Sequence, residues 1–212
     1  MIRNYIGVDI SLTGTGVCKL EANGRLVTSK CITTKAHKSF TQWFDRIDDI
    51  TKQVMLYVDE GSIVFVEGYA FGATGQVFNI AELSGYIKYQ LYRGNCTAVI
   101  QVPPTSLKKF ITGKGNAKKE LILKEVYKTY GVDFEDNNEA DAYALARMAY
   151  EVAQYHIDPE LNPLSANKLT ALDGVIKDNK GGDYEFFQKA ATYGRIGREH
   201  RRFVLSKRVR HS

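Results

Sequence analysis

The sequence predicts an α/β fold, with a mixed five-stranded sheet and helices on both of its faces. Three short strand-like runs open the chain, and the hairpin signal Asn23-Gly24 joins the second to the third. Two more apolar runs follow, separated by stretches of helical periodicity. The composition agrees, since 44% of the 212 residues are hydrophobic and 25% are charged, which excludes collagen-like, disordered and disulfide-stapled chains.

The predicted strands are short apolar runs that end at charged or turn-forming residues. We expect strands at residues 5–10, 16–20, 25–33, 62–66 and 96–102. Asp9 lies near the end of the first, Glu67 follows the fourth, and Pro103-Pro104 stops the fifth. The three leading strands should be antiparallel to one another, whereas the last two, each reached through a helix, should run parallel.

The predicted helices show apolar residues at intervals of three and four. Ser39 is placed to cap the first of them. Its apolar face comprises Phe40, Trp43, Phe44, Ile47, Ile50, Val54 and Val58. Further helices are expected at about 77–92, 106–111, 117–130 and 138–154, and beyond these, chain breakers surround short helical pieces. We therefore divide the chain into an α/β domain, residues 1–154, and a helical, basic C-terminal extension, residues 155–212.

Positive charge is concentrated at the C-terminus. The segment from Arg195 to Ser212 holds seven Lys or Arg residues and one acid, a net charge of +6, which leaves −1 for the rest of a chain with +5 overall. A basic terminus on a nearly neutral body is typical of proteins that bind a polyanion, most often nucleic acid. Arg201 and Arg202 are therefore candidate DNA contacts, and a solvated tail without a partner is the alternative.

Two further features bear on the compartment. No apolar run approaches the ~18 residues of a membrane span, and no charged-then-apolar leader opens the chain. Cys18, Cys31 and Cys96 lie far apart without a CxxC pair, which disfavours a zinc site or a disulfide framework. We expect a cytoplasmic protein with no membrane partner.

Three acidic residues stand where a metal site is expected. Asp9 and Glu67 lie at the C-terminal ends of buried strands, where open sheets bind their ligands. Asp141 begins an apolar helix face and should point toward the sheet. If the first and fourth strands are neighbours, the carboxylates converge, and oxygen ligands without His or Cys favour Mg²⁺ or Mn²⁺, two of which can support phosphodiester hydrolysis. The alternatives are a turn at Asp9 and a favourable helix-start charge at Asp141.

Four segments of the sequence resemble the RuvC-type Holliday-junction resolvases, which have an RNase H-like fold. The segments are GVDISLTGTGV (7–17), IVFVEGYAFG (63–72), PPTSLKKFITGKGNAKKELI (103–122) and NNEADAYALA (137–146). They stand in the expected order across about residues 2–150. The third is the most specific, because an RNase H-like fold alone does not require it.

The resemblance implies a homodimeric, metal-dependent endonuclease that nicks opposite strands of a four-way DNA junction symmetrically. It implies two Mg²⁺ ions per active site, for which Mn²⁺ substitutes, with Asp9, Glu67 and Asp141 as ligands. Residues 1–154 would then be an RNase H-like nuclease domain, and the added basic extension suits a phage-type member.

The fourth metal ligand is where the sequence departs from the family. The family places an acid or a histidine three residues before the last Asp, on the same helical face. Asn138 occupies that position, and its amide oxygen is a weaker, neutral ligand. Glu139 is an acid but lies about 200° round an ideal helix from Asp141. We expect Glu139, or else Asn138, to complete the set.

A lysine-rich segment lies between the fifth strand and the last long helix. Its glycines permit close backbone approach to a phosphate, and the amides that open the next helix favour anions. By the resemblance, Lys108 and Lys119 match the family's active-site lysines, with Lys119 a catalytic residue near the scissile phosphate. Lys114 and Lys118 are expected to bind DNA, and solvated surface lysines are the alternative.

The loop after Glu67 carries Tyr69 and Phe71 among glycines. Exposed aromatic side chains on such a loop can stack on unpaired bases, and the resemblance places a junction-wedging aromatic here. Covering the edge of the core is the alternative role. Three tyrosines on the following helix are expected to pack or to form the dimer interface: Tyr86, Tyr89 and Tyr92.

Other classes of function remain open at this point. The segment 7–17 also resembles the first phosphate loop of sugar-kinase and actin-like ATPases, but those need a second duplicated domain that 212 residues cannot easily hold. A nuclease of the same superfamily that acts on structured RNA or DNA flaps is a second alternative. A junction-binding protein without nuclease activity is a third, because Asn138 stands where an acid is usual.

Overall fold

We analysed a computed structural model of the chain. It describes residues 2, 4–36, 38–68, 77–94, 96–180 and 182–193. Tyr69 and Phe71, on the loop after Glu67, lie outside the described residues, as do Arg201 and Arg202 of the basic tail.

Five strands form one mixed sheet, as the sequence predicts, and their order is β3-β2-β1-β4-β5. The strands are β1 (Asn4–Asp9), β2 (Thr15–Glu21), β3 (Leu26–Ile32), β4 (Ile63–Glu67) and β5 (Ala98–Val102). The first three pair antiparallel, whereas β4 runs parallel to both β1 and β5. Parallel pairing of β1 with β4 brings the C-terminal ends of these two strands to the same edge of the sheet.

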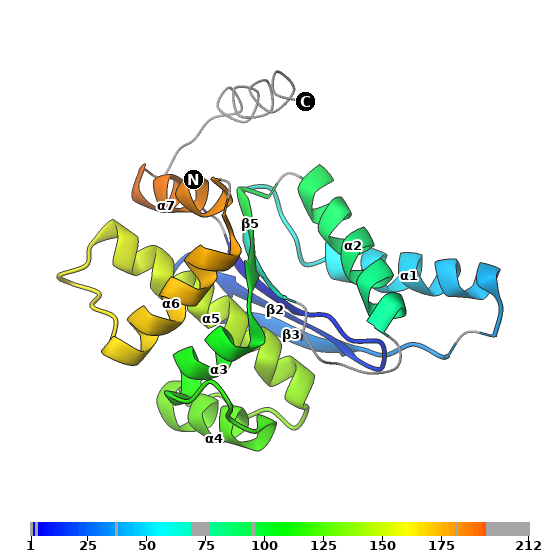
Figure 1. Cartoon of the computed structure of the whole chain (residues 1–212), viewed down its shortest axis with the longest axis horizontal. Coiled ribbons are helices and arrows are strands. Elements are labelled where there is room, and N and C mark those ends of the chain that lie inside the picture. The colour runs from blue at the N-terminus through cyan, green and yellow to red at the C-terminus, as the bar shows by residue number, and fades with distance from the viewer. Residues whose placement is uncertain are drawn as a thin grey trace.

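Helices cover both faces of the sheet (Figure 1). Alternate strand residues supply the two cores, so that Ile6 and Val8 pack beneath α1 (Phe40–Met55) and α2 (Val77–Arg93). The intervening residues face α5 (Asn137–Ile157), the longest helix of the described chain, together with the smaller helices around it. Three further helices lie on that side: α3 (Pro104–Thr112), α4 (Lys119–Tyr130) and α6 (Ala166–Asp178).

Helix α1 begins as predicted and ends earlier than predicted. The Ser39 hydroxyl accepts a hydrogen bond from the backbone N–H of Gln42 at 3.3 Å, so Ser39 is the cap. The helix ends at Met55, and Val58 therefore lies beyond it. The residues between are needed to turn the chain into β4, and the N–H of Val58 bonds to the carbonyl of Met55 in this turn.

The C-terminal helices pack on the same core as the sheet. Helix α5 continues to Ile157, and Leu172 of α6 and Phe187 of α7 (Asp183–Tyr193) belong to the core that lies beneath α5. The Phe187 ring stacks edge-on against Phe65 of β4, with 5.5 Å between ring centroids. The division into residues 1–154 and 155–212 stays a prediction. Among the described residues, no helix is both long and apolar enough to cross a bilayer.

Candidate active site

The two strand-end acids lie side by side. Val8 of β1 is opposite Val66 of β4, so the next residues, Asp9 and Glu67, stand at the same edge of the sheet. Strand side chains alternate between faces, and both acids therefore project toward α5 rather than toward α1 and α2. The first and fourth strands are thus neighbours, which is the condition under which the sequence places Asp9 and Glu67 together.

Glycines let α5 approach the sheet closely enough to bring Asp141 to this edge. A Cβ atom on Gly7 would lie 1.9 Å from the carbonyl oxygen of Ala142, and one on Gly16 would lie 2.0 Å from the carbonyl oxygen of Asn138. Any side chain at these two positions would force the helix outward. Asp141, one turn into α5, consequently faces the sheet and is only 5% exposed.

Burial makes the three carboxyl groups hard to ionise. Asp9 is 3% exposed, and burial, followed by the neighbouring charge of Glu67, raises its pKa well above the ordinary value. The Asp9 and Glu67 carboxyl groups are within hydrogen-bonding reach of each other, and burial also raises the pKa of Glu67. Burial and then the charge of Asp9 raise the pKa of Asp141 to about 6. Three buried carboxyl groups of this kind call for a compensating positive charge.

A lysine supplies positive charge to the cluster. The Lys119 Nζ atom, at the start of α4, lies 3.1 Å from the Oδ2 atom of Asp141. Burial lowers the pKa of Lys119, but the carboxyl groups of Asp141, Asp9 and Glu67 outweigh it, so its pKa is raised. Lys108 on α3 is also close enough to lower the pKa of both Glu67 and Asp141.

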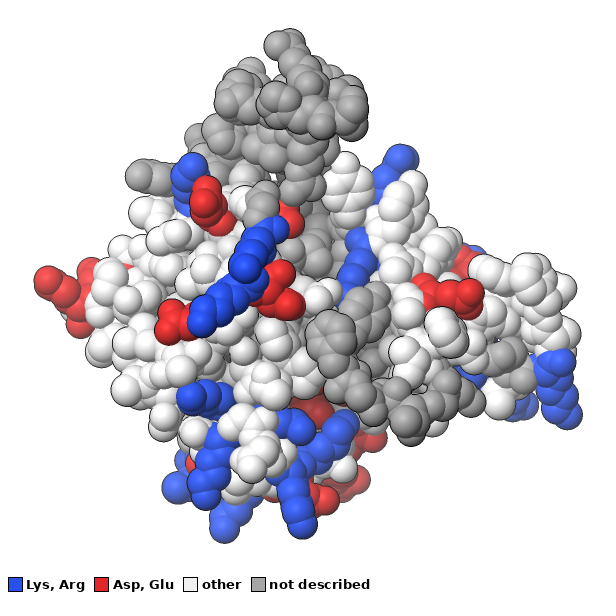
Figure 2. Space-filling view, in the orientation of Figure 1, with Lys and Arg blue, Asp and Glu red and all other residues white. Residues whose placement is uncertain are grey.

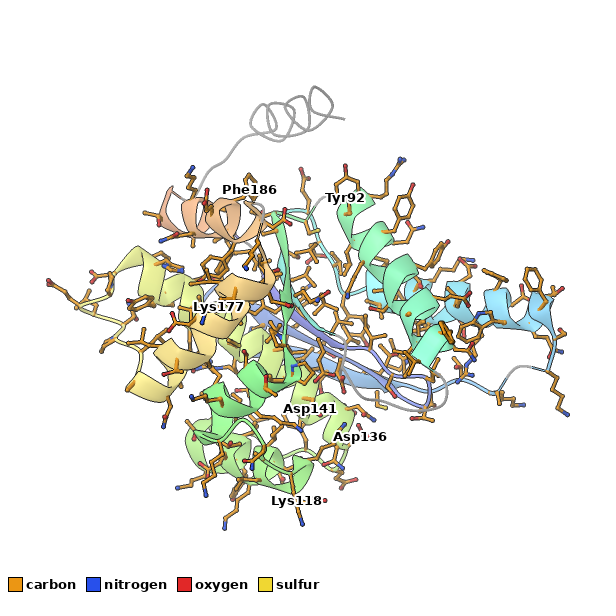
Figure 3. The ribbon with its side chains drawn as sticks, in the orientation of Figure 1. Tyr92, Lys118, Asp136, Asp141, Lys177 and Phe186 are labelled. Atoms are coloured by element: carbon orange, nitrogen blue, oxygen red, sulfur yellow. The ribbon has the colours of Figure 1, made fainter. Side chains whose placement is uncertain are left out.

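The other lysines of this segment face solvent. Helix α3 ends at Gly113, which adopts a left-handed conformation with φ 76°, and the chain then turns through an exposed loop into α4. Lys114 and Lys118 are exposed, and Lys118 projects away from Asp141 (Figure 3). Figure 2 shows lysines gathered on the surface over α3 and α4.

The residues present fit a hard divalent cation. The Oδ2 atom of Asp9 and the Oδ1 atom of Asp141 are buried without a hydrogen-bond partner, which is costly unless another group binds them. The ligands that Asp9, Glu67 and Asp141 offer are carboxylate oxygens, as Mg²⁺ and Mn²⁺ prefer. Within the described parts of the chain, no group of three or more Asp, Glu, His or Cys side chains lies close enough together to hold a metal ion as it stands.

Both predicted candidates for the fourth ligand turn toward β3. The Asn138 side-chain amide donates a hydrogen bond to the Cys31 Sγ atom at 3.6 Å. The Glu139 carboxylate accepts a hydrogen bond from the Ser29 hydroxyl. The structure therefore brings together Asp9, Glu67 and Asp141 and places the two candidates beside this group.

One acid near the site was not predicted from the sequence. Asp136 caps α5, and its Oδ1 atom accepts hydrogen bonds from the N–H groups of Asn138 at 2.7 Å and Glu139 at 3.1 Å. Its charge also contributes to raising the pKa of Asp9. The signal was present in the sequence, since an Asp followed three residues later by Glu is a helix-start pattern.

Comparison with known proteins identifies the fold. No protein-family model matches the chain, and no curated protein matches it in sequence. Among solved structures, Thermus thermophilus RuvC is similar with a TM-score of 0.58 at 20% identity, over 70% of this chain and 95% of that one. T. thermophilus RuvC in complex with Holliday junction substrate is similar with a TM-score of 0.56 at 17% identity, over 72% of this chain and 96% of that one. The predicted resemblance is confirmed in the fold, and this chain has the RNase H-like fold of the RuvC resolvases.

Proposed function

We propose that the chain is a metal-dependent endonuclease that nicks four-way or otherwise branched DNA. The observation that carries the proposal is the buried cluster of Asp9, Glu67 and Asp141, with Lys119 against it, at the strand ends of a RuvC-like fold. A similar solved structure, T. thermophilus RuvC, is in complex with a Holliday junction substrate, which supports branched DNA as the substrate class.

The acids are proposed to hold the metal. Asp9, Glu67 and Asp141 would bind Mg²⁺, or Mn²⁺ in its place, through their carboxylate groups, and two of these oxygens, on Asp9 and Asp141, are buried without a hydrogen-bond partner. Two such ions supply an activated water and a counter-charge for the leaving oxygen. Their burial excludes bulk water, so charge interactions with a bound phosphate are stronger here than at the surface.

Lys119 is proposed to act on the phosphate that reacts. Its half-exposed ammonium group is paired with Asp141. It can release this ion pair and bind a phosphate oxygen instead. Lys108 adds positive charge from the facing helix. A cation in this position stabilises the negative charge that develops during phosphodiester cleavage.

The exposed lysines around the site are proposed to hold the DNA backbone. Lys114 and Lys118 project from the loop between α3 and α4 into solvent, on the surface where lysines gather in Figure 2. The N-cap residue of α4, Lys118, makes no side-chain hydrogen bond to the first turn, where backbone N–H groups can favour a bound anion. Tyr69, Phe71 and the tail residues Arg201 and Arg202, which are outside the described residues, would add stacking and phosphate contacts.

We propose that the chain acts as a homodimer through α2. The outer face of this helix carries four exposed aromatic side chains, of which Phe78 is 83% exposed and Tyr92 58% exposed. The other two are Tyr86 and Tyr89. Pairing two copies through this face would bury the aromatic side chains and give one assembly two active sites, as nicking of two opposite strands requires.

A panel of substrates tests the proposed function. Four-way junctions, flaps, linear duplex DNA and structured RNA are incubated with the full chain and Mg²⁺, without nucleotide. We expect the junction to be nicked fastest, Asp9→Asn to abolish nicking, and Asp158→Asn, at the far end of α5, to leave it unchanged. Faster cleavage of RNA or flaps than of junctions would show that branched four-way DNA is not the preferred substrate. Cleavage that needs no Mg²⁺, or no cleavage of any substrate, would refute the proposed function.

A further inference from the structure

Helix α6 packs against α3, the helix that carries Lys108 (Figure 1). Gly174 lets the two helices come close, because a Cβ atom at this position would collide with the Oγ atom of Ser106 and lie 3.7 Å from its Cβ atom. Glycine weakens a helix interior relative to alanine, and the close approach to α3 is what it provides at this cost. The contact between Gly174 and Ser106 therefore sets the distance between α3 and α6.

The first turn of α6 lies against the end of α3. The side-chain nitrogen of Asn167 is 3.0 Å from the place that a Cβ atom would take on Gly113, the left-handed residue that ends α3. The Lys168 Nζ atom lies 4.8 Å from the centre of the Phe110 ring of α3, and it also pairs with Glu151 of α5. Helix α6 is thus fixed to α3 and α5 at the point where α3 passes into the exposed loop.

The other end of α6 is bound to the edge strand β5. Asn179 pairs with the backbone of Gln101 as a neighbouring strand would, since its Oδ1 atom accepts from the N–H at 3.0 Å and its Nδ2 atom donates to the carbonyl at 2.7 Å. The Gln101 side chain also donates a hydrogen bond to Asp178 at 3.1 Å. Because β5 leads into α3 through Pro103, α6 holds the chain both before and after α3.

The loop after α3 is attached to α3 itself. The Thr112 hydroxyl accepts a hydrogen bond from the backbone N–H of Lys114 at 3.1 Å. A Cβ atom on Gly115 would lie 3.3 Å from the carbonyl oxygen of Thr105, in the first turn of α3. A displacement of α3 would therefore move Lys108 and the loop together.

We propose that α6 positions the lysine-rich segment, which is α3 and the loop after it, for contact with DNA phosphates, and that Gly174 and Ser106 are positioning residues. This inference rests on the proposed function. The acids Asp9, Glu67 and Asp141 lie on β1, β4 and α5, so the sheet and α5 set their place. Separating α3 from α6 should misplace the lysines relative to the acids and leave the acids where they are.

The test wedges the two helices apart at Gly174. Gly174→Ala puts a methyl group against the Ser106 hydroxyl, and Gly174→Val adds two further carbons that a rotation of this hydroxyl does not avoid. Ser106→Ala, combined with Gly174→Ala, removes the hydroxyl and leaves the new methyl group 3.7 Å from the Cβ atom of residue 106, an ordinary contact. Thr170→Ala, at an exposed position of α6, is the matched control.

The readouts are made on the full chain, well below its unfolding temperature. They are the Kd for a four-way junction in Ca²⁺, the single-turnover nicking rate in Mg²⁺, and Mn²⁺ binding without DNA. We expect Gly174→Ala to lower the nicking rate about 10-fold and to raise the junction Kd, Gly174→Val to do so at least as strongly, and the double variant to recover most of both. Thr170→Ala should change neither, and Mn²⁺ binding should be the same in all variants.

Hydrogen exchange follows the segment without relying on activity. Backbone amides of residues 107–118 should exchange faster in Gly174→Ala than in Thr170→Ala, and the double variant should restore their protection. If the unmodified chain nicks no substrate, the proposed function fails, and this exchange still reports whether α6 holds the segment.

Two results would overturn the inference. In the first, Gly174→Ala and Gly174→Val lower the unfolding temperature but bind and nick the junction as the unmodified chain does, which would make α6 a purely stabilising helix. In the second, Gly174→Ala loses Mn²⁺ binding together with nicking, and Ser106→Ala recovers neither, which would show a general disruption of the fold.

Discussion

Lys119 and Asp141 form an ion pair that links the start of α4 to the first turns of α5, with 3.1 Å between Nζ and Oδ2. The lysine side chain is half exposed, whereas the aspartate is buried. A buried acid thus faces a half-exposed cation, where we propose that the phosphate binds. The pair relates the lysine-rich segment directly to the acidic cluster, and it makes Lys119 distinct from the exposed lysines of the same segment.

The first prediction separates Lys119 from its neighbour Lys118. Lys119→Ala should lower the single-turnover cleavage rate by about 100-fold or more, because a positioned cation acts on charge that develops in the transition state. Lys118→Ala, which removes an equal charge from a side chain that projects into solvent, should weaken DNA binding and leave the saturated rate unchanged. An unchanged rate in Lys119→Ala would remove this residue from the catalytic site.

The second prediction concerns the acids themselves. Asp9→Asn and Glu67→Gln should each abolish cleavage while junction binding stays nearly intact, since neutralising an acid removes metal affinity but also removes repulsion of phosphates. Ca²⁺ should support binding without turnover, because its coordination is looser than two-metal chemistry requires. Near-normal nicking by either variant in Mg²⁺ would exclude that residue from the site.

The third prediction is a pH dependence of stability. In the folded chain, the pKa of Asp141 is raised from 3.8 to about 6, so the folded state binds more protons than the unfolded state between these values. Stability of the metal-free protein should therefore fall as pH rises through this window. Urea unfolding in a chelator should show Asp141→Asn to be more stable than the unmodified chain at pH 7.5, with the difference vanishing near pH 4. A pH-independent difference would contradict the raised pKa.

The fourth prediction tests the close contact between sheet and helix. Gly16→Ala would place its Cβ about 2.0 Å from a backbone oxygen of Asn138, and should destabilise the fold by about 3 kcal/mol as α5 moves outward. Cleavage should fall as well, because Asp141 moves with the helix. Gly85→Ala, which meets nothing within 4 Å on α2, should instead stabilise by about 1 kcal/mol. Equal stability of the two variants would show that the helix is not held this closely.

The fifth prediction concerns the basic tail, which lies outside the described residues. Deleting residues 195–212 should weaken binding to junction and duplex by similar factors, because phosphate contacts carry no sequence or structure information. Each lost phosphate contact should flatten the slope of log K against log salt by ~0.9. A large loss of thermal stability with an unchanged salt slope would show that the tail docks on the protein.

The sheet and the three acids could be predicted because the signals are local. Asp9 and Glu67 each stand at the end of an apolar strand. The alternation of side chains along the strand decides which face of the sheet the two acids occupy. The side-chain directions of Asn138 and Glu139 could not be predicted in this way. Their partners, Cys31 and Ser29, stand more than 100 residues earlier in the chain, on a strand whose distance from α5 depends on glycines elsewhere.

The end of α1 likewise could not be predicted from the local sequence. Val58 continues the apolar spacing of the helix, but the helix stops at Met55 because the chain must reverse to enter β4. The apolar spacing indicates which residues can face the core. The place where the helix ends depends on how the chain must turn to reach the next strand. Asp136 was missed for a different reason, since a helix-cap pattern does not indicate that the charge of the cap also acts on Asp9.

A titration of Mg²⁺ against nicking of a synthetic four-way junction, with the products mapped on all four strands, is the decisive test of a metal-dependent junction nuclease. We expect no cleavage without metal, saturable nicking at symmetric positions on two opposite strands, and loss of both nicks in Asp141→Asn. Metal-independent nicking, or full activity of Asp141→Asn at saturating Mg²⁺, would contradict it.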